Sequence, residues 1–95
     1  MAILKSPAEI EIMAEGGRRL ARVIAALVQV IKPGLTTDFL DELSFRLITA
    51  ADAKPAFLGY RPAGAKKPYP KTLCASLNET VVHGLPGLYR LAEGD

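Results

Sequence analysis

Histidine and cysteine are nearly absent from this 95-residue chain, which holds one of each, His83 and Cys74. A single cysteine excludes an internal disulfide and is typical of proteins from a reducing compartment. Structural zinc sites need three or four converging Cys, His or carboxylate ligands, and the supply here is too small. The sequence therefore predicts that no metal is bound by these residues alone.

Long apolar runs and a strong charge of one sign are also missing. The longest apolar stretch, Val23–Ile31, is interrupted by Gln29 and is too short to span a bilayer. The N-terminal residues contain no extended apolar region of the kind found in signal peptides. Twelve basic against ten acidic residues give a net charge of +2, which does not favour a nucleic-acid partner. We expect a cytoplasmic protein without a membrane partner, forming one small domain over residues 1–95.

Two helices are predicted in the first half of the sequence. Ser6, Pro7 and Glu9 form an N-cap, a first helical residue and a capping-box partner, and apolar residues then recur at helical spacing until Lys32-Pro33-Gly34. Thr36 or Thr37 can cap a second helix that ends near Asp52. The short turn between them predicts an antiparallel pair. The Gly16-Gly17 pair is either a tolerated weakness or, as we prefer, a place where another backbone packs closely.

After Pro55 the pattern changes from helical spacing to short strands and loops. Residues 56–60, 72–77 and 80–83 are strand candidates, with a turn at Asn78-Glu79. Residues 61–71 contain three prolines and four basic residues and are typical of an exposed loop. Helix, helix and then strands predict an α+β fold with short antiparallel strands.

Few residues of this sequence are candidates for a catalytic role. A nucleophile pair of Cys74 and His83 is conceivable, but no orienting third group or oxyanion-hole motif accompanies it. The carboxylates of the two helices, including Asp38 and Asp41, are interpreted as solvated helix charges. No P-loop, GxGxxG or HExxH motif is present. The chain supplies at most one catalytic group.

The stretch KTLCASLNETVVHGLPG, residues 71–87, resembles a segment of type I methionine aminopeptidases. The family's pattern there is K–S–x–C–x–S–x–N–E–x–V–x–H–G–I–P. The residues that match are Lys71, Cys74, Ser76, Asn78, Glu79, Val81, His83, Gly84 and Pro86. The segments IKPGLTTDFLDEL, FLGY and SPAEIEIMAEGGRRLA also resemble the family, so the likeness covers almost the whole chain. The loop RPAGAKKPYP is longer than the family's usual loop at this place.

This resemblance implies the N-terminal portion of a pita-bread fold, with the sequence ending at Asp95, before the strands that carry the family's metal ligands. The implied activity of the longer parent is removal of the N-terminal methionine from nascent proteins, with two divalent ions (Co, Mn, Fe or Zn) as cofactors. This chain alone is expected to be inactive. Implied partners are nascent peptides, with no specific nucleic acid, and the parent is expected to be a monomer. The basic residues of loop 61–71 suggest the ribosome as a further partner, and a solvated loop is the favoured alternative. The alternatives are a pita-bread module that binds peptides or proteins without catalysis, and a truncated remnant.

The resemblance assigns substrate contact to His83, at the end of its motif. An imidazole can donate a hydrogen bond to a peptide group, and its near-neutral pKa allows either protonation state. Four further residues are expected to line the pocket for the methionine side chain, because an aromatic, partly sulfur-lined pocket suits a thioether. They are Phe57, Tyr60, Tyr69 and Cys74. Ordinary packing is the competing interpretation for each of these four.

Overall fold

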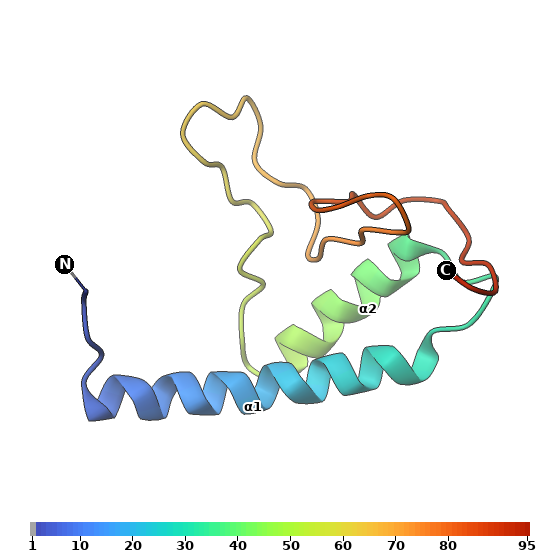
Figure 1. The fold of residues 1–95 in the computed structure, drawn as a ribbon. Helices are drawn as coiled ribbons and strands as arrows, with labels where there is room; N and C mark the ends of the chain where they lie inside the picture. The colour runs from blue at the N-terminus through green and yellow to red at the C-terminus, as the bar shows by residue number, and fades with distance from the viewer. Residues whose placement is uncertain (1) are drawn as a thin grey trace.

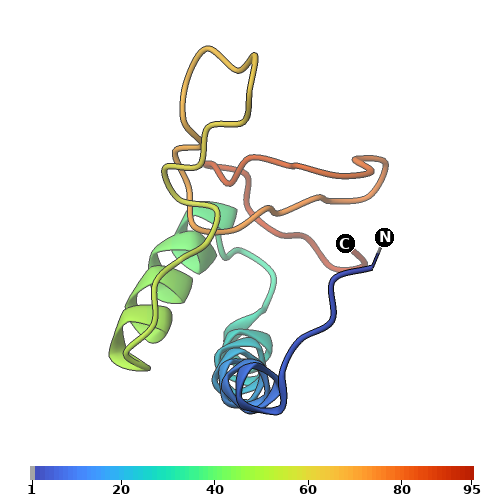
Figure 2. The same cartoon turned by 90° about the vertical axis from the view of Figure 1, so that its left-hand side faces the viewer.

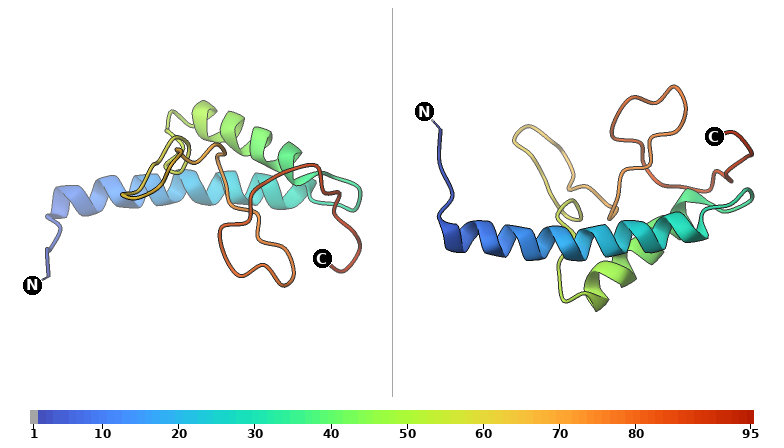
Figure 3. Two further views of the ribbon diagram at one scale, coloured as in Figure 1. Left: turned by 90° about the horizontal axis from the view of Figure 1, so that it is seen from above. Right: turned by 60° about the horizontal axis from the view of Figure 1, so that its bottom comes forward.

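Two helices and a long irregular segment make up the computed structural model, which describes residues 2–95. Helix α1 spans Pro7–Val30 and helix α2 spans Thr37–Ala50. In Figure 1, α2 runs back obliquely over α1 after the short connection between them. Residues after 55 lie to one side of the helix pair, as the end-on view in Figure 2 and the two views in Figure 3 show.

The start and end of α1 follow from its sequence. The Ser6 hydroxyl accepts from the Glu9 N–H at 3.2 Å, and the Ser6 N–H donates to the Glu9 carboxylate at 2.8 Å. This reciprocal pair satisfies two backbone donors that a helix start otherwise leaves free. After Ile31 the chain turns through Gly34, whose φ of +92° is accessible to glycine at little cost. The predicted first helix is confirmed.

Helix α2 is capped by Thr36, whose hydroxyl accepts from the Phe39 N–H at 3.1 Å. It ends at Ala50, and Asp52 beyond it has a φ of +59°. The Arg19 guanidinium of α1 donates to the carbonyl oxygen of Ala51 at 2.9 Å. This bond fixes the middle of α1 against the end of α2, since helix-terminal carbonyls lack partners of their own.

The interior of these residues is more polar than apolar. Within residues 2–95, the buried apolar residues are Val23, Leu40 and Pro86, whereas four polar residues are buried, namely Thr37, Asp41, Ser44 and Thr72. Much of the apolar side of α1 is exposed, with Ile12 at 73% and Val28 at 61% of full exposure. A Cβ on Gly16 or Gly17 would meet no atom within 4 Å, so the close backbone packing that we preferred there is wrong for residues 2–95.

The predicted strands do not form within residues 2–95, and the expectation of short antiparallel strands is wrong for this part of the chain. Residues 72–77 and 80–84 do approach one another, but within residues 2–95 only two backbone bonds join them, from the Ala75 N–H to the Gly84 oxygen at 2.7 Å and, across the turn, from the Thr80 N–H to the Leu77 oxygen at 2.8 Å. The Gly84 N–H donates instead to the Ser76 hydroxyl, and His83 adopts a φ of +59°. A lone hairpin with no third strand and no layer beneath it is at best marginally stable, so alternation alone did not suffice.

Backbone bonds nevertheless attach the last residues to the start of α2. The Gly34 N–H donates to the Leu91 oxygen at 2.7 Å and the Leu91 N–H to the Leu35 oxygen at 2.8 Å. Thr36 and Arg90 form an isolated antiparallel bridge. Neither α1 nor α2 is long and apolar enough to cross a membrane, a finding that covers residues 2–95.

Candidate substrate pocket

Five residues singled out in the sequence line one hollow. Phe57, Tyr60, Tyr69, Cys74 and His83 surround a cavity of about 610 Å³, together with residues of the proline-rich loop. The loop contributes Pro62, Ala65, Lys67, Pro68 and Pro70. The cavity lies in the range of small-molecule sites and is lined mainly by aromatic rings and proline. The structure thus brings together residues that are up to 26 positions apart (83 − 57).

Tyr69 anchors one wall of this pocket. Its N–H donates to the Tyr60 oxygen at 2.7 Å, and its carbonyl accepts from the Gly59 N–H at 2.8 Å. Its hydroxyl donates to the Leu73 oxygen at 2.9 Å. Burial and the neighbouring Cys74 thiol, with a smaller contribution from Asp41, raise the pKa of Tyr69 to about 12. Tyr69 therefore stays neutral and keeps its proton for the Leu73 carbonyl across the physiological range.

His83 also lines the cavity and is exposed to solvent. Gly84 beside it packs directly on residues 75 and 76, where a Cβ would overlap the Ala75 carbonyl oxygen. A turn closed by the Thr80 N–H on the Leu77 oxygen at 2.8 Å returns the chain to this point, with Asn78 at a φ of +50°. The close contact of Gly84 with residues 75 and 76, together with this turn, determines the position of the His83 imidazole.

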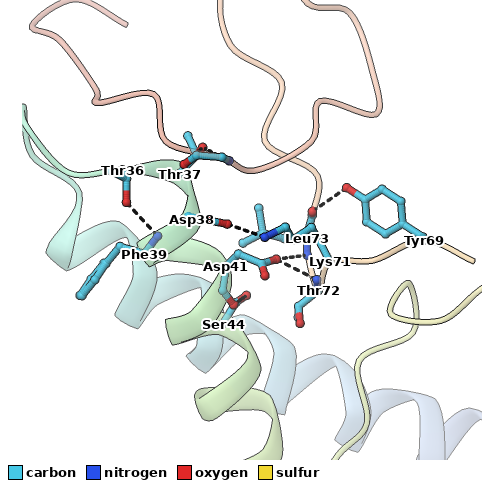
Figure 4. A network of polar contacts seen from close by, with 11 residues as sticks. Thr36, Thr37, Asp38, Phe39, Asp41, Ser44, Tyr69, Lys71, Thr72 and Leu73 are labelled. Atoms are coloured by element: carbon cyan, nitrogen blue, oxygen red, sulfur yellow. Dashed lines mark hydrogen bonds and ion pairs between the residues drawn. The ribbon is translucent and has the colours of Figure 1, made fainter.

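The start of α2 holds the segment that carries Cys74. The Asp41 carboxylate, with 8% of the residue exposed, accepts from the Thr72 N–H at 2.7 Å and the Leu73 N–H at 2.9 Å. Beside it, the Lys71 ammonium donates to the Asp38 carboxylate at 2.6 Å, and this contact raises the pKa of Lys71. Figure 4 shows these contacts gathered at the first turns of α2.

Asp38 and Asp41 are the residues that the sequence interpretation missed. Treating them as solvated helix charges is wrong for Asp41, which is buried, and for Asp38, which is paired across 33 positions. A signal was present, because Asp41 shares a helix face with Thr37, Leu40 and Ser44, at i−4, i−1 and i+3. A carboxylate on the inward face of a helix indicates a buried partner, since an unpaired buried charge is costly.

Metal binding finds no support in this part of the molecule. Within residues 2–95, no group of three or more His, Cys, Asp or Glu side chains is placed to hold a metal ion. What these residues can do is enclose an apolar side chain and present one imidazole to whatever is attached to it.

Comparison with known proteins gives a consistent set of relatives, while no family model matches the chain. A protein named methionine aminopeptidase from Clostridium perfringens is 38% identical over 95 residues, covering all of this chain and 36% of the relative. One from Chlamydia muridarum is 41% identical over 93 residues, covering 98% of this chain and 31% of the relative. Methionine aminopeptidase 1 of Bacillus subtilis is 40% identical over 95 residues, again with 36% of the relative covered. The chain spans about a third of the length of these curated relatives.

Proposed function

Because this chain is related over its whole length to methionine aminopeptidases, we propose that it is the pocket-bearing part of an enzyme that removes the N-terminal methionine from nascent proteins. The observation that carries the proposal is the single cavity shared by Phe57, Tyr60, Tyr69, Cys74 and His83. The relatives supply the reaction class and the cavity supplies a place for the substrate side chain.

In the proposed complex, the methionine side chain enters this cavity. A thioether gains favourable contacts with aromatic rings, here Phe57, Tyr60 and Tyr69, and with the polarisable Cys74 sulfur. His83, at the edge, donates a hydrogen bond to the first peptide group of the substrate and stabilises charge that develops there during hydrolysis. The residues therefore bind and orient the substrate.

The cofactor belongs to the longer parent protein in this proposal. We propose two divalent ions (Co, Mn, Fe or Zn) held outside residues 2–95, since no group of side chains within them fits a metal. No step of the reaction is assigned to a metal through these residues, and the isolated chain is proposed to be inactive.

The proposal extends to the domain, the location and the partners of the protein. We propose that residues 1–95 form the N-terminal part of one pita-bread catalytic domain in a monomeric, cytoplasmic protein. Nascent peptides are the proposed substrates. The loop 61–71, which projects away from both helices in Figure 1, is a proposed ribosome contact through exposed Lys66 and Lys67.

The test uses the parent protein with Mn²⁺ or Co²⁺ and a peptide that begins Met-Ala. Wild-type protein is expected to release methionine, and His83→Ala to lower kcat/KM by roughly 10²-fold, the usual scale for loss of a positioned catalytic imidazole. Val82→Ala is the matched control, because Val82 precedes His83 but is 62% exposed and does not line the cavity.

A parent protein that binds Met-peptides without releasing methionine would contradict the enzyme and favour a peptide-binding module. Equal losses in His83→Ala and Val82→Ala would show that the imidazole has no special part in the reaction.

A further inference from the structure

The backbone of Leu73 is held from both sides by side chains of distant residues. Its N–H donates to the Asp41 carboxylate at 2.9 Å, and its carbonyl oxygen accepts from the Tyr69 hydroxyl at 2.9 Å. The Thr72 N–H donates to the same carboxylate oxygen at 2.7 Å. Figure 4 shows this chain of contacts running from α2 through Leu73 to the Tyr69 ring.

The hydrogen bonds of Asp41 lie in a buried environment rather than on a solvated surface. Asp41 and Thr72 are 8% and 6% exposed, and Ser44, one turn further along α2, is 2% exposed. Hydrogen bonds from backbone N–H groups to a carboxylate are short and strong, and shielding from water strengthens them. The carboxylate oxygen is thus fixed on a rigid helix while the segment that it holds has no secondary structure of its own.

Two pocket residues depend on that segment. Cys74 follows Leu73 directly and lines the cavity, and the Tyr69 ring, which lines it as well, is oriented by its bond to the Leu73 oxygen. A shift of residues 72–73 would therefore move the sulfur and release the tyrosine hydroxyl together. Asp41 itself does not line the cavity.

We propose that Asp41 is a positioning residue of the pocket, which sets the places of Tyr69 and Cys74 through the backbone of Thr72 and Leu73 and so determines how the pocket selects among apolar side chains. This rests on the proposed function, because the selected group is the side chain of an N-terminal methionine. Asp38 assists from the side by holding Lys71 at 2.6 Å.

The first test measures how well the parent protein distinguishes two substrates, as kcat/KM for peptides that begin with Met or with norleucine, which lacks the sulfur. Asp41→Ala is expected to raise KM for the Met peptide and to lower the Met-to-norleucine ratio of kcat/KM by about fivefold or more, equivalent to about 1 kcal/mol. Asp41→Asn keeps an oxygen acceptor for both N–H groups and is expected to fall between Asp41→Ala and wild type. Glu42→Gln, an exposed neighbour, is the control.

A residue that served folding alone would lower the fraction of active protein, and with it kcat, while leaving KM and the ratio unchanged in both Asp41 variants. That result would overturn the inference.

The second test needs no turnover. In the parent protein, Cys74 is alkylated with iodoacetamide and its modification is followed by mass spectrometry of the peptide that contains it. The half-buried thiol is expected to react several-fold faster in Asp41→Ala than in wild type or Glu42→Gln. An unchanged rate in a folded variant would overturn the positioning role. If wild-type protein released no methionine while Asp41→Ala still exposed Cys74, the proposed function would fail and the positioning role would stand.

Discussion

The start of α2 and the length of α1 differ in what surrounds them. Around the first turns of α2, buried polar groups meet in specific pairs, with Thr37 bonded to Gly87 and Asp41 bonded to Thr72 and Leu73. Along α1 only Val23 is buried, and large side chains such as Ile12 and Met13 face solvent. Hydrogen bonds connect α2 to residues 71–73 and 87 of the later chain, whereas α1 is bonded through the Arg19 guanidinium to the Ala51 carbonyl at the end of α2.

This difference shows which interactions favour one specific arrangement of these residues. An apolar face stabilises any arrangement that covers it, because the hydrophobic effect is non-directional. Buried hydrogen bonds favour one arrangement, since a displaced partner leaves a costly unsatisfied group. The pocket is therefore expected to respond most strongly to changes at the start of α2 and at the tight contacts near it.

The largest effect is expected at Gly84. A Cβ there would overlap the Ala75 oxygen and come within 2.8 Å of the Ser76 Cα, and backbone atoms cannot rotate away. Gly84→Ala should cost about 1–3 kcal/mol, the range for overpacking, and should displace His83. The midpoint of denaturant unfolding and the methionine-release rate of the parent protein would both fall.

Gly87→Ala is the matched control, because a Cβ at Gly87 meets nothing within 4 Å. Equal unfolding midpoints for the two variants would show that the contact of residue 84 with residues 75 and 76 does not exist in solution.

Thr37→Val comes next in expected size. The Thr37 hydroxyl accepts from the Gly87 N–H at 2.8 Å and donates to the Gly87 oxygen at 3.2 Å, and the residue is 3% exposed. Valine keeps the shape but leaves both groups without this partner, which typically costs about 1–3 kcal/mol. Thr49→Val, on the exposed last turn of α2, should change the unfolding free energy by less than about 0.5 kcal/mol. Similar losses at both threonines would remove the distinction between the buried and the exposed end of α2.

A smaller difference in the free energy of unfolding is expected between a buried and an exposed position of α1. Val23→Ala removes buried methyl groups and should destabilise the 95-residue chain by roughly 1–2 kcal/mol. Ile12→Gln, at a position 73% exposed, should stay within about 0.5 kcal/mol of wild type. Hydrogen exchange of the 95-residue chain would measure both changes in local stability. A larger loss at Ile12 than at Val23 would mean that the apolar side of α1 is covered in solution.

The smallest effect concerns acid and the α1 capping box. The Ser6 backbone N–H, followed by its hydroxyl, lowers the pKa of Glu9 below its ordinary value of 4.5. A lowered folded-state pKa means that the stabilisation is present above pH 4.5 and is lost as pH falls through the folded-state value. Helical signal from the first turn of α1 should therefore decline below pH 4.5, as followed by amide chemical shifts. Glu9→Gln keeps an acceptor but cannot ionise, so its first turn should lose this pH dependence, and an unchanged decline would point to another group.

Local signals in the sequence sufficed for both helices, because caps, Pro7 and helical spacing act within a few residues. The five residues expected from the resemblance to line a pocket do surround one cavity. Their contact with a substrate stays a prediction. The prediction of strands was wrong. Alternation at residues 72–77 indicates which side chains share a face, but a strand also needs neighbouring strands to pair with. The bonds of Asp41 were missed because they join positions 31 and 32 residues apart, a separation that no local pattern encodes.

Amide hydrogen exchange of the 95-residue chain, measured by NMR at the start of α2 and at residues 72–73, tests most directly whether Asp41 holds the pocket wall. We expect the Thr72 and Leu73 amides to be protected although they lie outside any helix or strand, and Asp41→Ala to abolish this protection while the amides of residues 20–27 in α1 exchange as before. Thr72 and Leu73 amides that exchange at the rate of an unfolded peptide in the wild-type chain, while α1 and α2 remain protected, would contradict this expectation.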